Sequence, residues 1–367
     1  MQIAINATIT DPRSSGLGVY TVNVVRELSQ LTPSLTVFTS TPELFPESGI
    51  SLREVGVFVR TSFGLRGHVA RLLWAHFQLR KYLRKHDVAV LFSPTPLESI
   101  LNSPVPQVIV VHDLVPLFFP NYHPRQKYFY RSILPRILKS AARIVADSNS
   151  TRQDLIESYG LPEEKIDVIY AGYDREAFSF SERPSREQHR PSALYVGNLF
   201  PHKNLSRLLA AFAEASRQIP HELHIVGYLD PRYYPSLYDK ARQLNILDKV
   251  KFFGYVSQDQ LASLYSAADV FVYPSLYEGF GIPPLEAMAC GIPVIASSTK
   301  AVREVLGDAA EFVDASDVSA IAHTLITVAE SDVRKNRLRA KGFDRVKLFS
   351  WRKTALELHR VLVEVAS

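Results

Sequence analysis

The amino-acid sequence predicts an α/β protein built from two doubly wound parallel sheets. Short runs rich in valine and isoleucine alternate with longer amphipathic stretches along all 367 residues. Nearly continuous apolar runs, each followed by a helix pattern, are typical of parallel strands buried on both faces. Two series of this kind are separated by residues 174–191, which are polar, contain two prolines and lack apolar periodicity. At about 100–200 residues per domain, the length also indicates two domains.

Within the first half of the chain, apolar runs and amphipathic stretches alternate regularly. Strands are expected at residues 2–8, 35–39, 55–59, 88–92, 108–112, 143–147 and 167–170. Helices are expected at residues 18–31, 68–86, 125–142 and 149–158. Each expected helix lies between two expected strands, which is the arrangement that parallel strand pairs require.

The second half repeats this rhythm. Strands are expected at residues 193–197, 223–227, 250–254, 270–274 and 293–297. Helices are expected at residues 204–217, 231–245, 258–267, 284–290, 318–330 and 332–348. A further helix is expected at 351–366, near the end of the chain.

These patterns divide the chain into four parts. We expect a first Rossmann-like domain at 1–174, a linker at 175–191, a second Rossmann-like domain at 192–350, and a terminal helix at 351–367 that packs back toward the first domain. Ligands of doubly wound sheets bind beyond the carboxyl ends of the strands. Functional residues are therefore expected just after the strands, with a cleft between the two domains as the default site.

Composition excludes several classes of protein. A single cysteine, Cys290, excludes an internal disulfide framework and a cysteine-based zinc site. The first residues, MQIAINATITDP, show a strand pattern without the basic and apolar regions of a signal peptide. No apolar run approaches the ~20 residues that span a bilayer. We therefore expect a protein of the reducing cytoplasm.

The net charge of +5 arises from one local stretch of the chain. Residues 60–86 contain seven lysines and arginines and no acidic residue. Between residues 66 and 86, apolar side chains recur near helical spacing among the cations Arg71, Arg80 and Lys81, together with Trp74. A basic amphipathic helix with a tryptophan is typical of proteins that lie on anionic membranes. Two interpretations stay open: peripheral contact with the inner face of the cytoplasmic membrane, or an ordinary surface helix packed on the first sheet.

Two segments that follow strands of the first half carry candidate ligand-binding residues. Gly16 and Gly18 open a helix expected to start near Val19, where the backbone can approach a ligand and free N–H groups can bind an anion. His112 ends the strand at 108–112 and can donate a hydrogen bond to a sugar hydroxyl or a phosphate, or act as a general base. A tight turn for the glycines and a loop-stabilising histidine are the structural alternatives.

Lys203 follows the first strand of the second half, at the start of the helix expected at 204–217. A cation in the first turn of a helix opposes the helix dipole. An anionic ligand at this position would remove the conflict. The alternative is an exposed lysine without a functional role.

The most informative segment is EGFGIPPLE, from Glu278 to Glu286. Pro283 and Pro284 mark the start of a helix, and the glycines before it leave amide groups free to bind an anion. Glu278 precedes the helix and can fold over a ligand, whereas Glu286 can accept hydrogen bonds from a diol such as ribose. Two glutamates, two glycines and two prolines together favour a binding site over a purely structural segment.

This segment matches the E-x7-E signature of retaining glycosyltransferases, and the chain resembles glycosyltransferase family four. The resemblance extends over the whole chain and includes SGLGVYTVNVVREL, VHDLVPLFFP, ADSNSTRQDL, VGNLFPHKN and FSWRKTA. It implies the GT-B fold, in which two Rossmann-like domains face each other across a cleft. The first domain would bind the acceptor and the second the nucleotide-sugar donor. The resemblance also implies retention at the anomeric carbon, with no metal ion and no other cofactor.

The resemblance assigns donor-binding roles to the segment at 278–286. Glu278 would contact the hydroxyls of the donor sugar, with the backbone of Gly279, Phe280 and Gly281 beside it. Glu286 would hold the ribose of the nucleotide.

Other candidates also receive roles from the resemblance. Lys203 would neutralise the diphosphate of the donor, and the backbone N–H of Gly16 would reach the diphosphate from the first domain, with Gly18 in the same donor-binding turn. His112 would line the sugar pocket near the reacting face. The expected catalytic residues are His112, Lys203 and Glu278.

One position departs from the family pattern. Many relatives have arginine directly after the glycine that precedes this lysine, whereas here Gly197 is followed by Asn198. The diphosphate would then meet one fixed cation fewer, unless His202 or Arg207 supplies the charge. Asn198 can still donate a hydrogen bond to the donor.

The motifs VHDLVPLFFP and VGNLFPHKN look most like those of bacterial mannosyltransferases and rhamnosyltransferases of polysaccharide assembly. We therefore expect a retaining hexosyltransferase that moves mannose from GDP-mannose, or else a sugar from dTDP-rhamnose or a UDP-hexose, to a glycan or lipid-linked acceptor. The first alternative is a nucleotide-sugar epimerase of the same fold. The second is a nucleic-acid-binding protein that uses residues 60–86, although this stretch has no known nucleic-acid motif and nucleic acid is not the expected partner.

Overall fold

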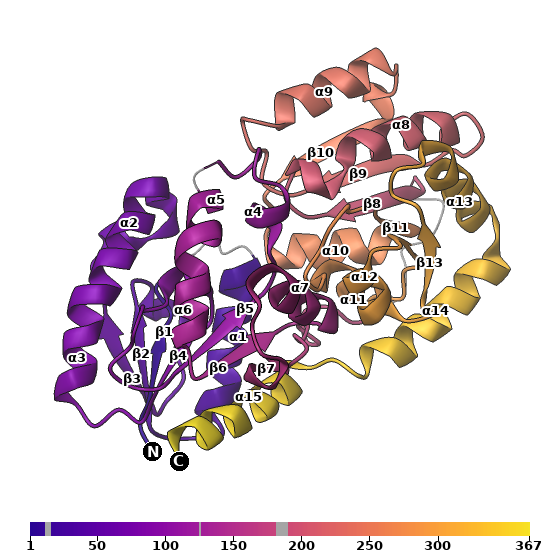
Figure 1. Ribbon diagram of the computed structural model, residues 1–367. Helices are drawn as coiled ribbons and strands as arrows, with labels where there is room; N and C mark the ends of the chain where they lie inside the picture. Colours follow the sequence, from indigo (N-terminus) through magenta and orange to yellow (C-terminus); the bar gives the residue numbers. More distant parts are fainter. Residues whose placement is uncertain (12–15, 125, 181–189) are drawn as a thin grey trace. The chain divides into compact units, whose positions relative to one another are not determined.

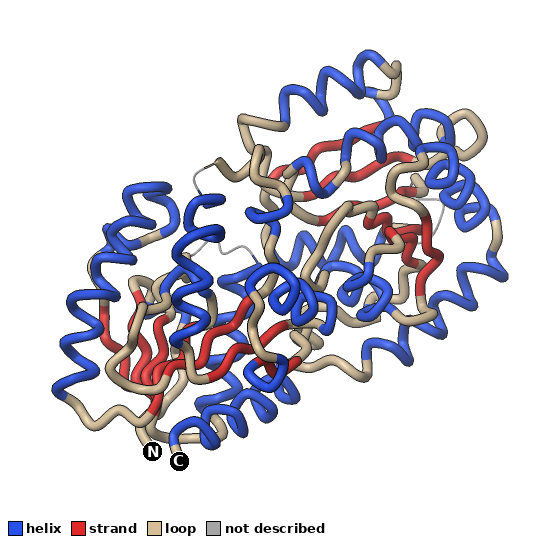
Figure 2. Tube along the Cα trace, viewed as in Figure 1, coloured by secondary structure: helices blue, strands red, loops and turns tan. Residues whose placement is uncertain are grey.

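The structure is a computed structural model that describes residues 1–11, 16–124, 126–180 and 190–367 (Figure 1). The chain divides into two compact units, Met1–Gly172 with Ser350–Ser367, and Tyr173–Phe349. Within the linker expected at 175–191, residues 175–180 belong to the second unit, and residues 181–189 lie outside the described part of the chain. Each unit contains one parallel sheet with helices packed beside it (Figure 2), so the predicted doubly wound α/β class is confirmed.

The sheet of the first unit has seven parallel strands in the order β3-β2-β1-β4-β5-β6-β7. The strands are β1 Ile3–Asn6, β2 Leu35–Thr39, β3 Ile50–Glu54, β4 Val90–Ser93, β5 Gln107–Val111, β6 Arg143–Ala146 and β7 Ile166–Val168. The central strands β1, β4 and β5 are buried along their whole length, as continuous apolar runs predict. Strands β2 and β3 extend the sheet to one side of β1, whereas β4 to β7 extend it to the other side. The switch point therefore lies between β1 and β4, and doubly wound sheets bind ligands at such a point.

The helices of the first unit cover this sheet. They are α1 Gly16–Ser29, α2 Gly64–Trp74, α3 Arg80–Lys85, α4 Val115–Phe118, α5 Gln126–Tyr128, α6 Leu134–Ser140, α7 Asn149–Tyr159 and α15 Trp351–Ala366. Single π-helical segments, 75–79 and 129–133, join α2 to α3 and α5 to α6. The terminal helix α15 packs on α1, β4 and β5 of the same unit.

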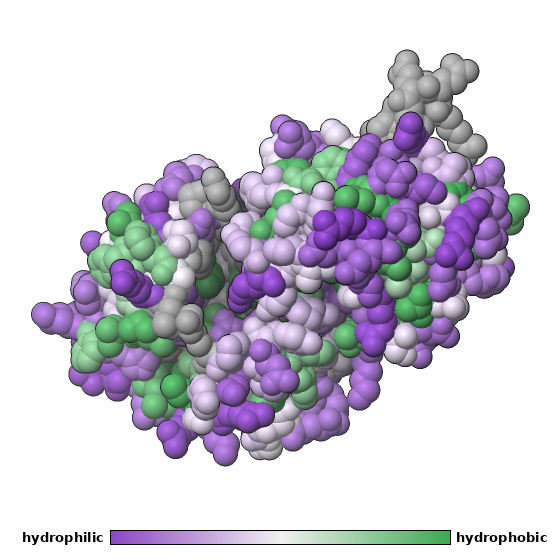
Figure 3. Space-filling model, turned by 90° about the horizontal axis from the view of Figure 1, so that it is seen from above, coloured by the Kyte–Doolittle hydropathy of each residue, from purple (hydrophilic) through white to green (hydrophobic). Residues whose placement is uncertain are grey.

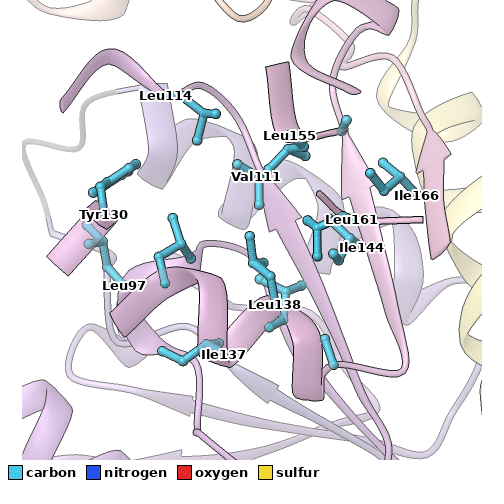
Figure 4. Packing of buried hydrophobic residues seen from close by; sticks show 14 of the residues in the cluster. Leu97, Val111, Leu114, Tyr130, Ile137, Leu138, Ile144, Leu155, Leu161 and Ile166 are labelled. Atoms are coloured by element: carbon cyan, nitrogen blue, oxygen red, sulfur yellow. The ribbon is translucent and has the colours of Figure 1, made fainter. Parts of the chain in front are cut away.

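A core of aliphatic side chains fixes β5 and β6 beneath α6 and α7 (Figure 4). Val111 and Ile144 from the strands are fully buried against Leu138 of α6 and Leu155 of α7. Burying one such side chain stabilises the fold by about 1.5–3 kcal/mol. The carboxyl ends of β5 and β6 are therefore anchored, and the residues that follow them are held in place.

The second unit repeats the arrangement with six parallel strands in the order β10-β9-β8-β11-β12-β13. The strands are β8 Ser192–Val196, β9 Glu222–Val226, β10 Val250–Gly254, β11 Val270–Tyr273, β12 Val294–Ser297 and β13 Ala310–Val313. The helices are α8 Leu205–Ala215, α9 Tyr234–Gln243, α10 Gln258–Ala267, α11 Ile282–Ala289, α12 Lys300–Leu306, α13 Val318–Glu330 and α14 Asp332–Val346. The switch point of this sheet lies between β8 and β11.

Two local predictions are wrong, and some elements were missed. The apolar run at 55–59 is not a strand: Gly56 opens a short 3-10 helix, and the edge strand β3 lies just before it. Side chains on β3 are mostly exposed, so the strand lacks the apolar pattern that marks the others. The pair β13 and α12 was not predicted from the sequence. The helix α1 begins at Gly16, so the predicted start near Val19 is also wrong and both glycines lie in its first turn.

Candidate functional site

In the second unit, Lys203 and Glu278 meet at the switch point of the sheet. Lys203 lies in the loop after β8, and Glu278 lies in the loop after β11. The ammonium Nζ is 2.6 Å from Oε1 and 2.9 Å from Oε2 of the carboxylate. The two side chains are only 11% and 10% exposed. Because β8 and β11 are neighbours, two residues 75 positions apart form one buried ion pair.

The electrostatics of this pair favour the charged form of Glu278. Burial alone would raise the pKa of Glu278, but the charge and hydrogen bonds of Lys203 outweigh it, so the pKa lies below its ordinary value. The hydroxyl of Tyr273, at the end of β11, lies 3.5 Å from the lysine Nζ. Burial and the Glu278 charge raise the pKa of this phenol well above its usual range, so Tyr273 stays neutral. The site therefore presents one cation and one anion, each stabilised by the other.

Asn204 holds the two loops of this site together. Its backbone is left-handed, with φ of 64°, which asparagine tolerates better than most residues. Its side-chain amide donates to the carbonyls of Pro274, at 3.0 Å, and Ala315, at 2.7 Å. The backbone N–H of Leu276 also donates to the carbonyl of His202, at 2.7 Å. These bonds fix Lys203, the residue between His202 and Asn204, beside the loop that carries Glu278.

Of the two candidate replacements for the missing arginine, one is hydrogen-bonded and the other is buried. Arg207 donates from Nη1 to Oδ1 of Asn204 at 2.9 Å, and His202 is buried. Asn198 itself is exposed, and its Oδ1 accepts a hydrogen bond from the backbone N–H of Phe200. Its carbonyl accepts a hydrogen bond from Tyr195 at 2.8 Å. Asn198 thus shapes the loop after β8.

The glycines after β8 and β9 allow their loops to approach each other closely. Gly227 has φ of 154°, and a Cβ atom there would lie 1.8 Å from the carbonyl oxygen of Gly197. No side chain fits that space, so the backbone near Asn198 depends on glycine at both positions.

Glu286 lies on α11, where Tyr265 donates a hydrogen bond to Oε2 at 2.8 Å. Burial raises the pKa of Glu286 to about 7, because the Tyr265 hydrogen bond only partly offsets it and Asp174 adds to the increase. Gly281, with φ of 95°, caps the helix. Phe280 is buried and packs edge-on against Phe349, with 5.8 Å between ring centroids, which anchors the segment between the two glutamates.

In the first unit, His112 follows β5 and is enclosed by two hydrogen-bond acceptors. Its Nδ1 lies 2.5 Å from Oδ2 of Asp147, and its Nε2 lies 2.9 Å from the carbonyl oxygen of Pro94. Burial alone would lower the pKa of His112, but Asp147 and the Pro94 carbonyl outweigh it and raise the pKa above its ordinary value. The geometry favours a charged imidazolium over the neutral general base considered from the sequence.

A cavity of about 40 Å³ lies beside His112 at the switch point of the first sheet. Its wall contains His112 and Leu17, the residue between Gly16 and Gly18. Thr95, Pro96, Leu97, Asp113 and Tyr130 complete the wall. Gly16 is exposed and Gly18 is buried in the first turn of α1, and residues 12–15, just before them, lie outside the described part of the chain.

The sequence interpretation missed a buried polar cluster under this cavity. Glu98 is fully buried, and its Oε1 lies 3.3 Å from Nε of Arg71, which is 4% exposed. Thr95 donates a hydrogen bond to the other carboxylate oxygen. Burial raises the pKa of Glu98, although Arg71 and Thr95 counteract it. Asp147 was missed too, although it follows a strand, as His112 does.

Two residues of the basic stretch point inward, as the interpretation of a helix packed on the first sheet predicts. Arg71 forms the buried pair just described, and Trp74 is 7% exposed and packs on Phe38, with 5.6 Å between ring centroids. The outer surface of this stretch instead carries Val69, Leu73 and Phe77, which are 45%, 54% and 70% exposed. The phase of the helix explains the difference, because its sheet-facing side needs apolar and paired groups.

Within the described ranges, no three His, Cys, Asp or Glu side chains are placed to hold a metal ion. None of the helices in those ranges combines the length and apolar character needed to cross a membrane.

Both units match known families. Residues 14–177 match the family described as Glycosyltransferase Family 4, and residues 178–345 match Glycosyl transferases group 1. The chain is 31% identical over 297 residues to O-antigen chain mannosyltransferase B of Escherichia coli. The matched region covers 77% of this chain and 74% of that protein. It is 35% identical over 212 residues to O-antigen chain mannosyltransferase RfbU of Salmonella typhimurium, covering 58% of this chain and 57% of that protein.

Solved structures share the fold. Sucrose-phosphate synthase from Thermosynechococcus elongatus matches with a TM-score of 0.81 at 20% identity, over 100% of this chain and 99% of the other. Anabaena HepE in complex with UDP and glucose matches with a TM-score of 0.76 at 20% identity, over 99% of this chain and 100% of the other.

Proposed function

The chain belongs to glycosyltransferase family 4, and we propose that within this family it is a retaining mannosyltransferase that uses GDP-mannose. The predicted GT-B class and glycosyltransferase activity follow from the family, which also disfavours the epimerase alternative. The choice of mannose is supported by the two O-antigen mannosyltransferases among the similar proteins. The acceptor is a glycan or a lipid-linked saccharide.

One observation carries the proposal for the site: the buried Lys203–Glu278 pair at the switch point of the second sheet. Breaking the anomeric C–O bond places negative charge on the leaving diphosphate. Lys203 and the amide groups at the start of α11 would stabilise that charge by preorganised electrostatics. Glu278 would accept hydrogen bonds from sugar hydroxyls once the lysine turns to the phosphate.

We expect the transfer to proceed without a metal ion, because Lys203 supplies a fixed cation for the diphosphate. The acceptor would attack from the same face that the diphosphate leaves, and the leaving phosphate would help to deprotonate it. Treatment with EDTA should leave the rate of transfer unchanged. A loss of activity that added Mg²⁺ restores would refute the metal-independent mechanism.

A thermal-shift panel of GDP-mannose, dTDP-rhamnose and UDP-hexoses tests the donor. A ligand that binds the folded state raises stability by RT ln(1 + [L]/Kd), about 2.7 kcal/mol at one hundred times Kd. GDP-mannose should give the largest increase in Tm and should support transfer with retention. A larger shift with a UDP or dTDP sugar would overturn the choice of donor and leave the family assignment intact.

The outer surface of residues 66–86 supports the membrane interpretation of the basic stretch. Exposed Leu73 and Phe77 lie near the exposed cations Lys81, Arg84 and Lys85. Figure 3 shows hydrophobic residues exposed beside hydrophilic ones on the first unit. A surface of this composition can insert apolar side chains among anionic headgroups.

Liposome flotation tests this contact. The protein should float with vesicles that contain anionic lipid, and Phe77→Ser should weaken flotation. Phe253→Ser, in the second unit, alters another exposed phenylalanine and serves as the control. Absence of binding to vesicles with and without anionic lipid would favour an ordinary surface helix.

A further inference from the structure

His112 connects the ends of three neighbouring strands in the first unit. It follows β5, its Nδ1 faces Asp147 after β6, and its Nε2 faces the carbonyl of Pro94 after β4. The order β4-β5-β6 places these ends side by side. The histidine therefore ties together the two loops that flank its own strand.

The chemistry of the two partners determines the protons on the ring. A carboxylate and a backbone carbonyl both accept hydrogen bonds and cannot donate them. Both ring nitrogens must therefore carry a proton for both contacts to be hydrogen bonds. Only the imidazolium form meets this condition, and Asp147, 3% exposed, supplies its counter-charge.

The contact with Pro94 has a consequence for the cavity. Pro94 directly precedes Thr95, Pro96 and Leu97, which form one wall of the cavity, and His112 lines it as well. Asn6 supports the same loop by donating to the carbonyl of Glu98 at 2.9 Å. A neutral His112 would lose one of its two bonds and loosen its hold on the loop.

We propose that Asp147 is a positioning residue that keeps His112 as an imidazolium bridge between the loops after β4 and β6 and so fixes the wall of the cavity. It acts through His112 and touches no substrate. This role rests on the proposed glycosyl transfer only for its effect on activity, because the protonation of His112 can be measured without a substrate.

The charged groups around His112 make the expected titration specific. Asp147 and Asp113 both raise its pKa. Glu98 interacts with it from the loop after β4, and the pKa of the Glu98 carboxyl is itself raised by burial. Tyr20 of α1 packs edge-on with 4.6 Å between ring centroids and stays a neutral phenol, because burial and Asp147 raise its pKa. Loss of the Asp147 charge removes the largest influence that opposes the burial of the ring.

NMR titration of the histidines, with His112→Gln used for assignment, tests the proposal directly. The pKa of His112 in the wild type should lie above the ordinary value of about 6.5. In Asp147→Asn it should titrate at or below that value. Asp87→Asn removes an exposed carboxylate of the same unit and should leave the His112 titration unchanged. A wild-type His112 that titrates at or below about 6.5 would overturn the proposal, even if the Asp147 variant fails to fold.

The pH profile of transfer separates positioning from a general structural role. Using the donor with the largest thermal shift, kcat/KM of Asp147→Asn should fall about tenfold more than that of the wild type between pH 6 and pH 8. A purely structural defect would lower activity equally at every pH and would refute the proposal. Absence of transfer with GDP-mannose would refute the proposed donor and leave the NMR result to decide the role of Asp147.

Discussion

The two units hold their charged pairs in different ways, although both pairs lie at the ends of parallel strands. Lys203 and Glu278 have flexible side chains, and the lysine Nζ lies 2.6 Å from Oε1 of the glutamate. His112 is held at 2.5 Å from Asp147 on one side and at 2.9 Å from a backbone carbonyl on the other. The first pair can exchange partners when an anion arrives, whereas the second cannot without breaking a bond to the main chain.

This difference indicates a division of labour. In the second unit, we propose that an anionic ligand takes Lys203 and releases Glu278 for hydroxyl groups, so that the pair occupies the place of the ligand. In the first unit, the proposed imidazolium would fix the wall of a cavity. We call Lys203–Glu278 the convertible pair and propose that it serves a site that binds a charged substrate. His112–Asp147 is a fixed pair, and we propose that it holds the wall of the cavity.

The largest effect is expected from Lys203→Ala. Removing this cation should lower kcat/KM about 10³-fold, because the diphosphate loses its preorganised partner. Steady-state transfer assays measure the effect. Lys240→Ala, on α9 in the same unit, removes a half-buried lysine whose Nζ donates to Ser206 and should leave transfer near normal.

The double variant Lys203→Ala/Glu278→Ala decides whether the pair is functional or structural. Each single change leaves one buried charge without its partner and should lower Tm, whereas the double change removes both charges and should recover much of that loss. Transfer should be strongly reduced in all three variants. Near-normal turnover in any of them would contradict the convertible pair.

Much of the second site could be predicted from the sequence, and much of the first could not. Lys203 could be predicted because it is a cation at the start of a helix, and Glu278 because it lies in a motif dense in glycine and proline. Asp147 needs the strand order, because its partner His112 lies 35 positions away on a neighbouring strand. Arg71 needs the phase of α2 as well, since only burial distinguishes it from the exposed cations nearby.

A third prediction tests the backbone of the loop that leads to Lys203. Gly227→Ala should destabilise the protein by about 3 kcal/mol, because the new Cβ would collide with the Gly197 carbonyl and the left-handed backbone would be strained. Urea denaturation measures the loss. A variant as stable as the wild type would mean that the loops after β8 and β9 can separate, and the site would then be less preorganised than the hydrogen bonds of Asn204 indicate.

The pH dependence of donor binding tests Glu286. Its pKa of about 7 means that the carboxyl is mostly neutral at pH 6 and ionised at pH 8. If the ribose donates to the carboxylate, donor affinity should increase about tenfold over this range, as the ionised fraction rises through the pKa. Calorimetric titration at both pH values measures it. Glu286→Gln should bind more weakly at pH 8 and show no such increase; parallel pH profiles would place the ribose elsewhere.

The smallest expected effect comes from Gly16→Ala, and it sharpens the contrast with Gly227. A Cβ atom at Gly16 would meet none of the described residues within 4 Å, and Gly16 lies in the first turn of α1. Alanine favours a helix over glycine by up to about 1 kcal/mol, so the free energy of unfolding should stay the same or rise slightly. If the Gly16 N–H approaches a diphosphate, the added methyl group should still weaken donor binding. Urea denaturation together with donor titration separates the two effects. A stable variant with weaker donor binding assigns Gly16 to the substrate, whereas unchanged binding shows that its role is confined to the first turn of α1.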